Sequence, residues 1–217
     1  MTQAQCPSCA RLQEPRLFCL ECGVPLAVEL DYFAALGLPR RPSIDPRHLE
    51  NLYHELGRRV HPDRYANRAD AVRDASLTAT ALLTRAFRTL RDPVSRGLYW
   101  LELHGEKLAT DNQKVPPELA ELIFGVQESL AELRAAEGRG DADRGSLRQQ
   151  MVEQKQAVDA SLAKTLSELE RIFAQWDFDV SENPRSIVQL KAILSRINYL
   201  RTLIRDMDRE LDVHDLR

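Results

Sequence analysis

Residues 45–65 read D-P-R-H-L-E-N-L-Y-H-E-L-G-R-R-V-H-P-D-R-Y, and this stretch decides the fold. Its apolar side chains recur at three- and four-residue spacing, which predicts one buried face on a helix of about four turns. These apolar residues are Leu49, Leu52, Tyr53, Leu56 and Val60. We expect the helix to end near His61, because Pro62 disfavours helical backbone in the residue before it.

Helical spacing resumes beyond this turn, at Val72, Ala75, Ala79, Leu82, Leu83, Ala86 and Leu90. Before the turn, residues 31–39 read D-Y-F-A-A-L-G-L-P, in which Asp31 is an N-cap residue and Gly37 and Pro39 are stop signals. The middle of the chain is therefore predicted to hold a short helix and an antiparallel helix pair. An exposed loop containing His61, Pro62, Asp63 and Arg64 joins the pair.

All four cysteines lie near the amino terminus as two C-x-x-C pairs, Cys6 with Cys9 and Cys19 with Cys22. Each pair can bind one metal ion from a tight turn, and four thiolates suit the tetrahedral preference of Zn²⁺. A segment of roughly 25 residues cannot build a hydrophobic core, so the metal must supply its folding energy. We predict a structural zinc site with these four cysteines as ligands.

Three alternatives for the cysteines remain open. Two disulfides would need an oxidising compartment, which a chain without an export signal does not reach. A redox-active pair needs a C-x-x-C motif that opens a helix after a strand, and the segment offers no such unit. Thiolate spacing alone does not exclude an iron–sulfur cluster.

Three further apolar stripes follow Gly105 and predict a three-helix bundle. The first helix opens at Pro116-Pro117 and carries Leu119, Leu122, Ile123, Val126, Leu130 and Leu133. The glycines after it, Gly138, Gly140 and Gly145, are expected to interrupt the helical structure before the second helix. The second helix carries Leu147, Met151, Val158, Leu162, Leu166, Leu169 and Phe173 and ends near Trp176. Asn183 is expected to cap the third, which has Pro184 at its first position.

Composition excludes several classes of protein. The chain has 217 residues, 9 glycines and 11 prolines, which favours an all-α fold over a β-sandwich or barrel. No apolar run is long enough to span a membrane, and no export signal is visible, so we expect a cytoplasmic protein. The formal net charge of −3 does not favour a nucleic-acid partner, and residues 1–30 carry only Arg11 and Arg16 as basic groups.

The His-Pro-Asp turn between two amphipathic helices, with D-Y-F-x-x-L-G-L before it, resembles the J-domain of DnaK-partner co-chaperones. Residues 31–217 together resemble the HscB branch of that family, which serves iron–sulfur cluster assembly. The residues that narrow the resemblance to this branch are Pro93, Arg96, Tyr99, Leu101, His104 and Gly105. The amino-terminal cysteine pairs resemble the knuckles of some eukaryotic relatives and are absent from many bacterial ones.

The resemblance implies an ATPase contact through the loop and the helix before it. The residues that the resemblance assigns to this contact are His61, Pro62, Asp63, Arg58, Arg59 and Arg64. It also implies that the first bundle helix binds an iron–sulfur scaffold protein, with Phe124 and Glu128 as the matching positions. Phe124 lies at the margin of its apolar stripe, so the spacing leaves open whether it is core or surface. No nucleophile lies near His61 or Asp63 in the sequence, so we expect no enzyme active site.

The expected organisation is a zinc-binding segment over 1–30, a J-domain over 31–105 and a client-binding bundle over 106–217. The expected function is a co-chaperone that stimulates an HscA-like ATPase of the DnaK type and delivers an IscU-like scaffold to it. A J-protein for a different client, a zinc-ribbon adaptor and a thiol oxidoreductase are the alternatives. Neither the identity of the partners nor self-association is decided by the sequence.

Overall fold

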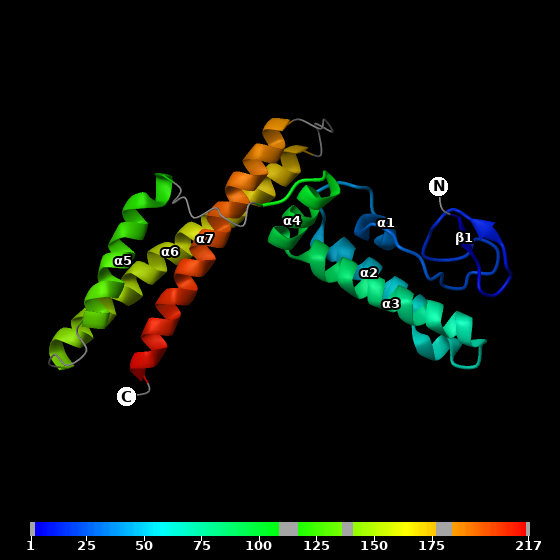
Figure 1. The fold of residues 1–217 in the computed structure, drawn as a ribbon, viewed down its shortest axis with the longest axis horizontal. Helices are drawn as coiled ribbons and strands as arrows, with labels where there is room; N and C mark the ends of the chain where they lie inside the picture. Colours follow the sequence, from blue (N-terminus) through cyan, green and yellow to red (C-terminus); the bar gives the residue numbers. More distant parts are fainter. Residues whose placement is uncertain (1–2, 109–116, 136–140, 177–183, 216–217) are drawn as a thin grey trace. The chain divides into compact units, whose positions relative to one another are not determined.

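The computed structural model describes residues 3–108, 117–135, 141–176 and 184–215 (Figure 1). Over these residues the chain forms seven α-helices and one small two-stranded sheet, which confirms the predicted all-α class. The chain divides into two compact units. The first contains Met1–Trp100 and Phe173–Val180, and the second contains Leu101–Ile172 and Ser181–Arg217. The domain boundaries at 30/31 and 105/106 stay predictions.

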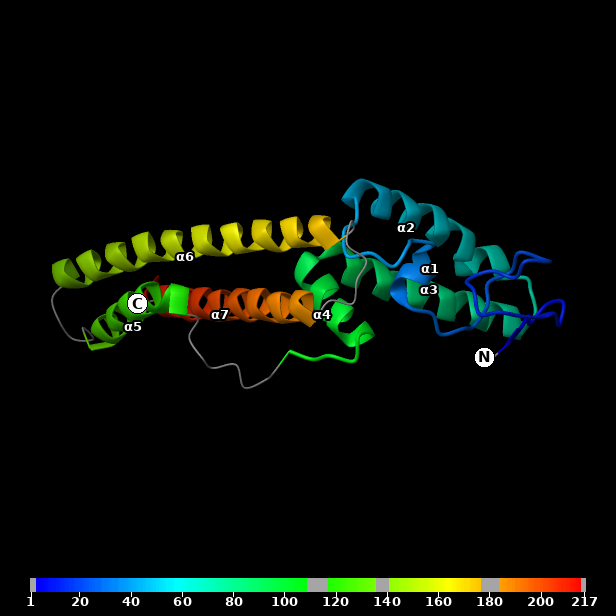
Figure 2. The same ribbon diagram turned by 90° about the horizontal axis from the view of Figure 1, so that it is seen from above.

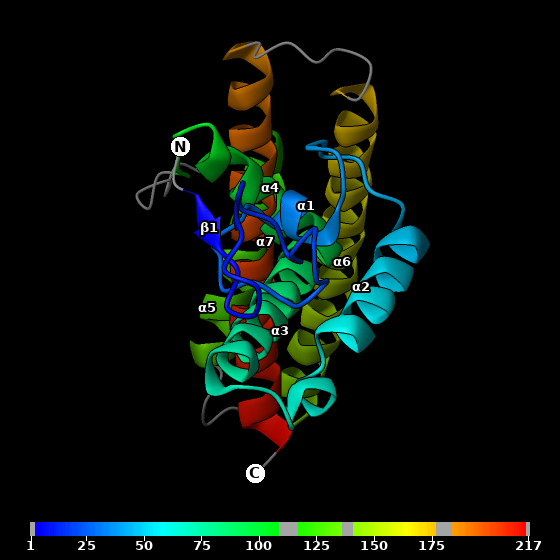
Figure 3. The same cartoon turned by 90° about the vertical axis from the view of Figure 1, so that its right-hand side faces the viewer.

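The first unit begins with a small ribbon that carries the cysteines. Strands β1 (Ala4–Gln5) and β2 (Leu12–Gln13) pair antiparallel, with Ala4 opposite Gln13. An isolated bridge joins Phe18 to Pro25 further along. This is too little sheet to hold a fold, so the ribbon depends on its cysteine site and on its contacts with the hairpin residues Arg59 and Val72. Figure 3 looks at the molecule from the side on which the ribbon lies.

Helix α1 (Tyr32–Leu36) begins and ends as the sequence predicts. The Asp31 carboxylate accepts a 3.0 Å hydrogen bond from the Ala34 N–H, and Gly37 adopts a left-handed φ of 70° directly after the helix. The tyrosine ring of Tyr32 stacks on that of Tyr99 at 4.4 Å between centroids. This stack joins the start of α1 to a later helix of the same unit.

Helices α2 (Pro46–Val60) and α3 (Asp70–Arg91) form the predicted hairpin, and a single 3₁₀ turn, η1 (Pro62–Tyr65), joins them. Helix α2 ends before His61, as the proline in the turn dictates. Small buried residues on α3 let the neighbouring helices approach closely, among them Ala75, Ser76, Ala79 and Ala86. The hairpin therefore holds the turn at one end of a rigid helix pair.

Helix α4 (Pro93–Leu103) was not expected as a separate element. Its start has a clear local signal, because the Asp92 carboxylate accepts hydrogen bonds of 2.8 Å from both the N–H and the hydroxyl of Ser95. Pro93 occupies the first helical position, where its missing N–H costs nothing. Asp92-Pro93 therefore begins a new helix after α3.

The second unit is the predicted three-helix bundle, formed by α5 (Ala120–Ala135), α6 (Asp141–Trp176) and α7 (Pro184–Asp215), with the short turn η2 (Pro117–Leu119) before α5 (Figure 2). One apolar cluster draws on η2 and all three helices, with Leu119, Ile123, Val126, Leu130, Met151, Val158, Leu200, Leu203 and Met207 buried in it. The last residues of α6 belong to the first unit.

One predicted helix break is wrong. Gly145 lies inside α6, which already begins at Asp141. A single glycine costs a helix only about 1 kcal/mol, which the 36-residue helix and its buried face offset. Gly138, Gly140 and the predicted cap at Asn183 lie outside the described residues. Across the described part of the chain, none of the helices combines the length and the apolar character that a bilayer crossing requires.

Candidate functional site

The two cysteine knuckles are built alike, residue for residue. In the first, the Ala10 N–H donates to the Cys6 carbonyl at 3.0 Å and the Cys6 N–H donates to the Arg11 carbonyl at 2.9 Å. In the second, Gly23 and Val24 make the same two bonds to Cys19, at 3.0 and 2.9 Å. Both turns need a left-handed residue after the second cysteine, and these residues are Ala10 (φ 58°) and Gly23 (φ 70°).

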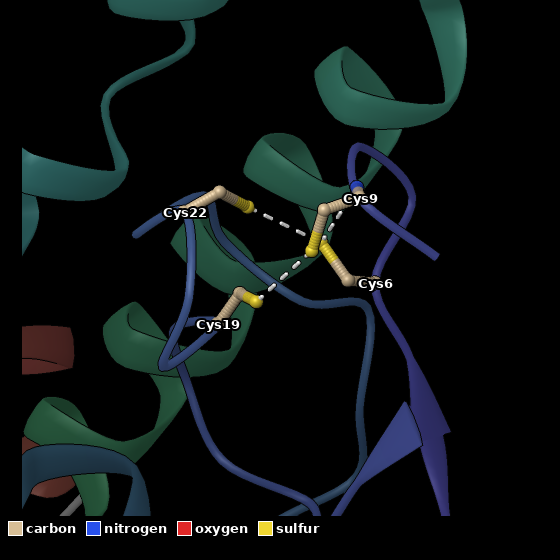
Figure 4. A group of neighbouring side chains, drawn as sticks. All are labelled: Cys6, Cys9, Cys19 and Cys22. Carbon is tan, nitrogen blue, oxygen red and sulfur yellow. Dashed lines mark hydrogen bonds between the residues drawn. The ribbon is translucent and has the colours of Figure 1, made fainter. Parts of the chain in front are cut away.

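The knuckles bring all four sulfur atoms to one point (Figure 4). The Sγ atoms lie within 4.8 Å of one another, with 3.5 Å between Cys6 and Cys22 and 3.6 Å between Cys9 and Cys19. A tetrahedral Zn²⁺ with Zn–S bonds of about 2.3 Å places its ligands roughly 3.8 Å apart. The donor set and its spacing therefore fit one four-coordinate metal ion.

Two of the thiols, those of Cys9 and Cys19, have pKa values shifted in opposite directions. The backbone N–H of Cys22 stabilises the Cys19 thiolate and lowers the pKa of Cys19 to about 6, although burial acts in the other direction. At Cys9 the backbone at Arg11 lowers the pKa, but burial and hydrogen bonds with the other three thiols raise it more, to about 12. A close group of thiols cannot hold four negative charges without a cation, and a bound metal ion supplies that cation.

The metal-ligand cluster is buried on one side only. Cys6 and Cys19 are buried, whereas Cys9 and Cys22 are exposed. The buried side belongs to an apolar cluster of Cys6, Cys19, Val24, Leu26 and Val72, with Ala4, Val28 and Tyr65 packed against it. Val72 lies in the first turn of α3, so the cysteine ribbon shares its core with the helical hairpin.

The His-Pro-Asp turn presents its polar side chains to solvent. The Asp63 side chain is 89% exposed and that of His61 is 56% exposed. Within the turn, Nδ1 of His61 accepts a 3.3 Å hydrogen bond from the Asp63 N–H and lies 3.5 Å from the Asp63 carboxylate. The turn is thus locally ordered while its carboxylate stays accessible to a partner.

The end of α2 is anchored from two sides, which holds this turn in place. Ser76 on α3 donates a 2.5 Å hydrogen bond to the carbonyl of Val60. The Thr80 hydroxyl lies 3.4 Å from the same oxygen but makes its shorter bond, 2.9 Å, to the Ser76 carbonyl. The Tyr65 hydroxyl donates to the Arg59 carbonyl at 3.0 Å. Carbonyls at a helix end have no partner within the helix, so these side chains satisfy them.

The basic residues expected around the turn all lie on the surface. Arg58, Arg59 and Arg64 are exposed. Arg59 makes one contact that the sequence did not predict, because its guanidinium carbon lies 4.1 Å from the centroid of the Phe18 ring in the cysteine ribbon. The sequence signals for Phe18 and Tyr65 are only their positions, one residue before Cys19 and two after Asp63.

The two expected scaffold contacts lie together on the exposed side of α5. Phe124 is 73% exposed, and Glu128 is exposed one helical turn further on. The buried face of the same helix carries Ile123, Val126 and Leu130. The question that the spacing left open is thereby answered, because Phe124 is a surface residue.

Comparisons with known proteins give one family. No family model matches the chain. A co-chaperone protein HscB homolog from Azoarcus sp. (strain BH72) is 36% identical over 147 residues, which are 66% of this chain and 81% of that relative. The co-chaperone protein HscB of Proteus mirabilis (strain HI4320) is 37% identical over 84 residues, covering 39% of this chain and 49% of that protein.

Solved structures that resemble this chain are also HscB proteins. The crystal structure of human co-chaperone protein HscB aligns with a TM-score of 0.66 and 28% identity, over 94% of this chain and 96% of the human one. Chaperone HscB from Vibrio cholerae aligns with a TM-score of 0.58 over 86% of this chain and 99% of its own, and its 22% identity supports the fold alone.

A helical hairpin with an exposed His-Pro-Asp turn, followed by a three-helix bundle, defines a J-domain co-chaperone. The identity with the Azoarcus relative extends over most of that protein. The chain therefore belongs to the HscB family of co-chaperones.

Proposed function

We propose that this protein stimulates ATP hydrolysis by an HscA-like chaperone of the DnaK type and delivers an IscU-like iron–sulfur scaffold protein to it. The observation that carries the proposal is the His-Pro-Asp turn, which is anchored at its base and exposed at its tip. An accessible Asp63 carboxylate beside exposed arginines suits a polar protein interface. The chain itself catalyses nothing in this scheme.

The scaffold would bind to α5 through Phe124 and Glu128. An exposed aromatic side chain beside a carboxylate is the kind of group on which binding energy concentrates. One partner on the bundle and another on the hairpin makes the mechanism bivalent, since linkage raises the local concentration of scaffold at the ATPase. Iron–sulfur cluster assembly and transfer would benefit from that delivery.

We further propose Zn²⁺ as the metal of the cysteine site and the cytoplasm as the location of the protein. Four thiolates in a closed set suit a structural zinc site, and a reducing compartment keeps the thiols available. Elemental analysis of the purified chain should give one zinc per molecule. Iron with visible cluster absorption would contradict the zinc assignment.

A nucleic-acid adaptor role has less support from the ribbon. Both of its arginines lie beside glutamates, Arg11 against Glu21 and Arg16 3.9 Å from Glu14. Phosphate recognition relies on clusters of basic groups whose charge is not already compensated.

The experiment is a steady-state ATPase assay with an HscA-like chaperone, an IscU-like scaffold and this protein, added singly and together. We expect stimulation by this protein alone, and a larger stimulation with scaffold than the two separate effects add up to. An absence of stimulation at saturating protein would refute the ATPase role. Stimulation that scaffold does not increase would refute the delivery role. Copurification from the native host would identify the partners.

A further inference from the structure

The cysteine ribbon covers the end of the hairpin that carries the His-Pro-Asp turn. Val72, in the first turn of α3, is only 3% exposed, and it belongs to the apolar cluster of the ribbon. Tyr65, the last residue of η1, packs against the same cluster. Two of the five buried residues of this cluster are the metal ligands Cys6 and Cys19, so we expect loss of the metal to loosen the cover over both side chains.

A second contact reaches the last turn of α2, at the exposed residue Arg59. The guanidinium of Arg59 lies over the ring of Phe18, which directly precedes the metal ligand Cys19. A guanidinium that stacks on an aromatic face keeps the N–H groups at its edge available for a carboxylate. Phe18 is therefore a platform that limits the orientations of Arg59 while the arginine stays exposed.

The backbone of the same residue is held as well. The Tyr65 hydroxyl donates to the Arg59 carbonyl, while Tyr65 packs against the apolar cluster that the ribbon shares with Val72 of α3. Two contacts thus converge on Arg59, one through its side chain and one through its carbonyl. The ribbon makes the first contact itself through Phe18, and the residue that makes the second packs against the cluster that the ribbon shares with α3.

We propose that the metal-loaded ribbon is a positioning element for the ATPase contact. Phe18 and Tyr65 are its positioning residues, and they preorganise Arg59 and the His-Pro-Asp turn for an acidic surface on the ATPase. This inference rests on the proposed function, which supplies the ATPase. Preorganisation strengthens binding by reducing the conformational freedom that is lost in the complex. Metal loss would weaken the contact without touching His61, Pro62 or Asp63.

The first test needs no ATPase. Amide hydrogen exchange is measured on the full chain, metal-loaded and after removal of the metal under reducing conditions. The reporters are the N–H groups of Arg64 and Arg68, which donate within the turn to His61 and Tyr65. We expect faster exchange of these amides after metal removal and no change in α7, which serves as the internal control. Unchanged exchange around the turn would overturn the proposal.

The second test uses variants that keep the metal. Tyr65→Phe removes the hydroxyl and keeps the ring, and we expect it to speed exchange of the turn with one metal still bound. Tyr53→Phe is the matched control, because it also removes one tyrosine hydroxyl, but Tyr53 lies in α2 and its ring stacks on Phe87 on α3. Equal exchange in the two variants would contradict a positioning role for Tyr65.

The third test is a double-mutant cycle on the stacked pair. Phe18→Leu and Arg59→Lys each remove the stack, and Arg59→Lys keeps the charge. Each is expected to raise the concentration for half-maximal ATPase stimulation about two- to fivefold. The maximal stimulation should stay unchanged in Phe18→Leu, and the double variant should raise the half-maximal concentration no more than the worse of the two single variants does. If the fold increases of the two single variants multiply in the double variant, the two residues act independently, and the proposed role of Phe18 as a platform for Arg59 is wrong.

Failure of this inference and failure of the proposed function are distinguishable. If the loaded wild-type chain does not stimulate the ATPase at all, the proposed function fails and takes the ATPase part of the inference with it. If the wild type stimulates, and the metal-free chain and Phe18→Leu stimulate with unchanged half-maximal concentrations, the inference alone fails.

Discussion

The hydroxyl of Ser76 on α3 donates a 2.5 Å hydrogen bond to the carbonyl of Val60, the last residue of α2. Ser76 is fully buried, so this bond ties the two helices together directly beneath the His-Pro-Asp turn. The Thr80 hydroxyl, at 3.4 Å from the same oxygen, makes its shorter bond to the Ser76 carbonyl at 2.9 Å, so it is a poor substitute donor. The hydrogen bond between Ser76 and Val60 therefore fixes the position of the end of α2 relative to α3.

Ser76→Ala should lower the free energy of unfolding of the first unit by about 1–3 kcal/mol, because the variant leaves a buried carbonyl poorly satisfied. Urea denaturation followed by circular dichroism measures the loss. The neighbouring exposed Thr78→Ala on α3 is the matched control and should cost far less. Equal losses in the two variants would show that the hydroxyl of Ser76 has no special part in the hairpin.

The two left-handed residues of the cysteine knuckles predict opposite effects on metal affinity. An added Cβ at Gly23 meets no atom within 4 Å, so Gly23→Ala suffers backbone strain alone, about 1–2 kcal/mol or roughly a 5- to 30-fold weaker metal affinity. Ala10→Gly relieves the same strain and should strengthen binding by a smaller factor, because glycine also loses more entropy on folding. Competition with a coloured chelator measures the metal affinity of both variants. A higher affinity in Gly23→Ala than in Ala10→Gly would contradict the role of the left-handed backbone at these positions.

The local elements of this chain are readable in the sequence, because each has a local cause. Pro62 ends α2, Asp31 and Gly37 bound α1, and the paired cysteines predict one metal-ligand cluster. Helix α4 has an equally local signal in Asp92-Pro93, an N-cap residue followed by a proline at the first helical position.

Contacts between segments that are far apart in the chain have no such local cause, so the sequence pattern does not indicate them. Nothing in the spacing of α3 says that Val72 is buried against the cysteine ribbon, since its position fits the helix stripe equally well. The stack of Phe18 on Arg59 joins residues that share no pattern. The exposure of Phe124 was undecided, because a residue at the margin of a stripe is placed by its neighbours in space.

Phe124 gives a prediction for the client side of the protein. Phe124→Ala should leave thermal melting of the full chain unchanged, because the side chain is exposed, and should weaken scaffold binding by about 1–2 kcal/mol. Calorimetric titration with the scaffold measures the affinity. Val188→Ala on α7 is the control, since Val188 is a similarly exposed apolar residue of the same unit. Unchanged affinity in Phe124→Ala would remove this residue from the client face.

The raised pKa of Tyr99 predicts how the free energy of unfolding changes at alkaline pH. Burial raises the pKa of Tyr99, whose hydroxyl also accepts a 2.9 Å hydrogen bond from the Tyr32 N–H. A raised pKa in the folded state means that the neutral phenol stabilises the fold below the ordinary value of about 10. This contribution is lost as pH rises through the raised value.

The stability difference between wild type and Tyr99→Phe should therefore shrink as the pH rises from about 8 to about 11. Chemical denaturation at each pH measures it, and the comparison cancels the titration of other groups. A difference that stays constant across this range would contradict the role of the half-buried phenol.

The most direct measurement of the central claim is the ATPase rate of the HscA-like partner with wild type, His61→Gln and His48→Gln. His48 is an exposed histidine at the other end of α2, so its variant controls for the loss of an imidazole. We expect His61→Gln to retain its fold and metal and to abolish stimulation, because the exposed turn supports no core. His48→Gln should stimulate like the wild type. Full stimulation by a folded His61→Gln would contradict the assignment of the His-Pro-Asp turn as the ATPase contact.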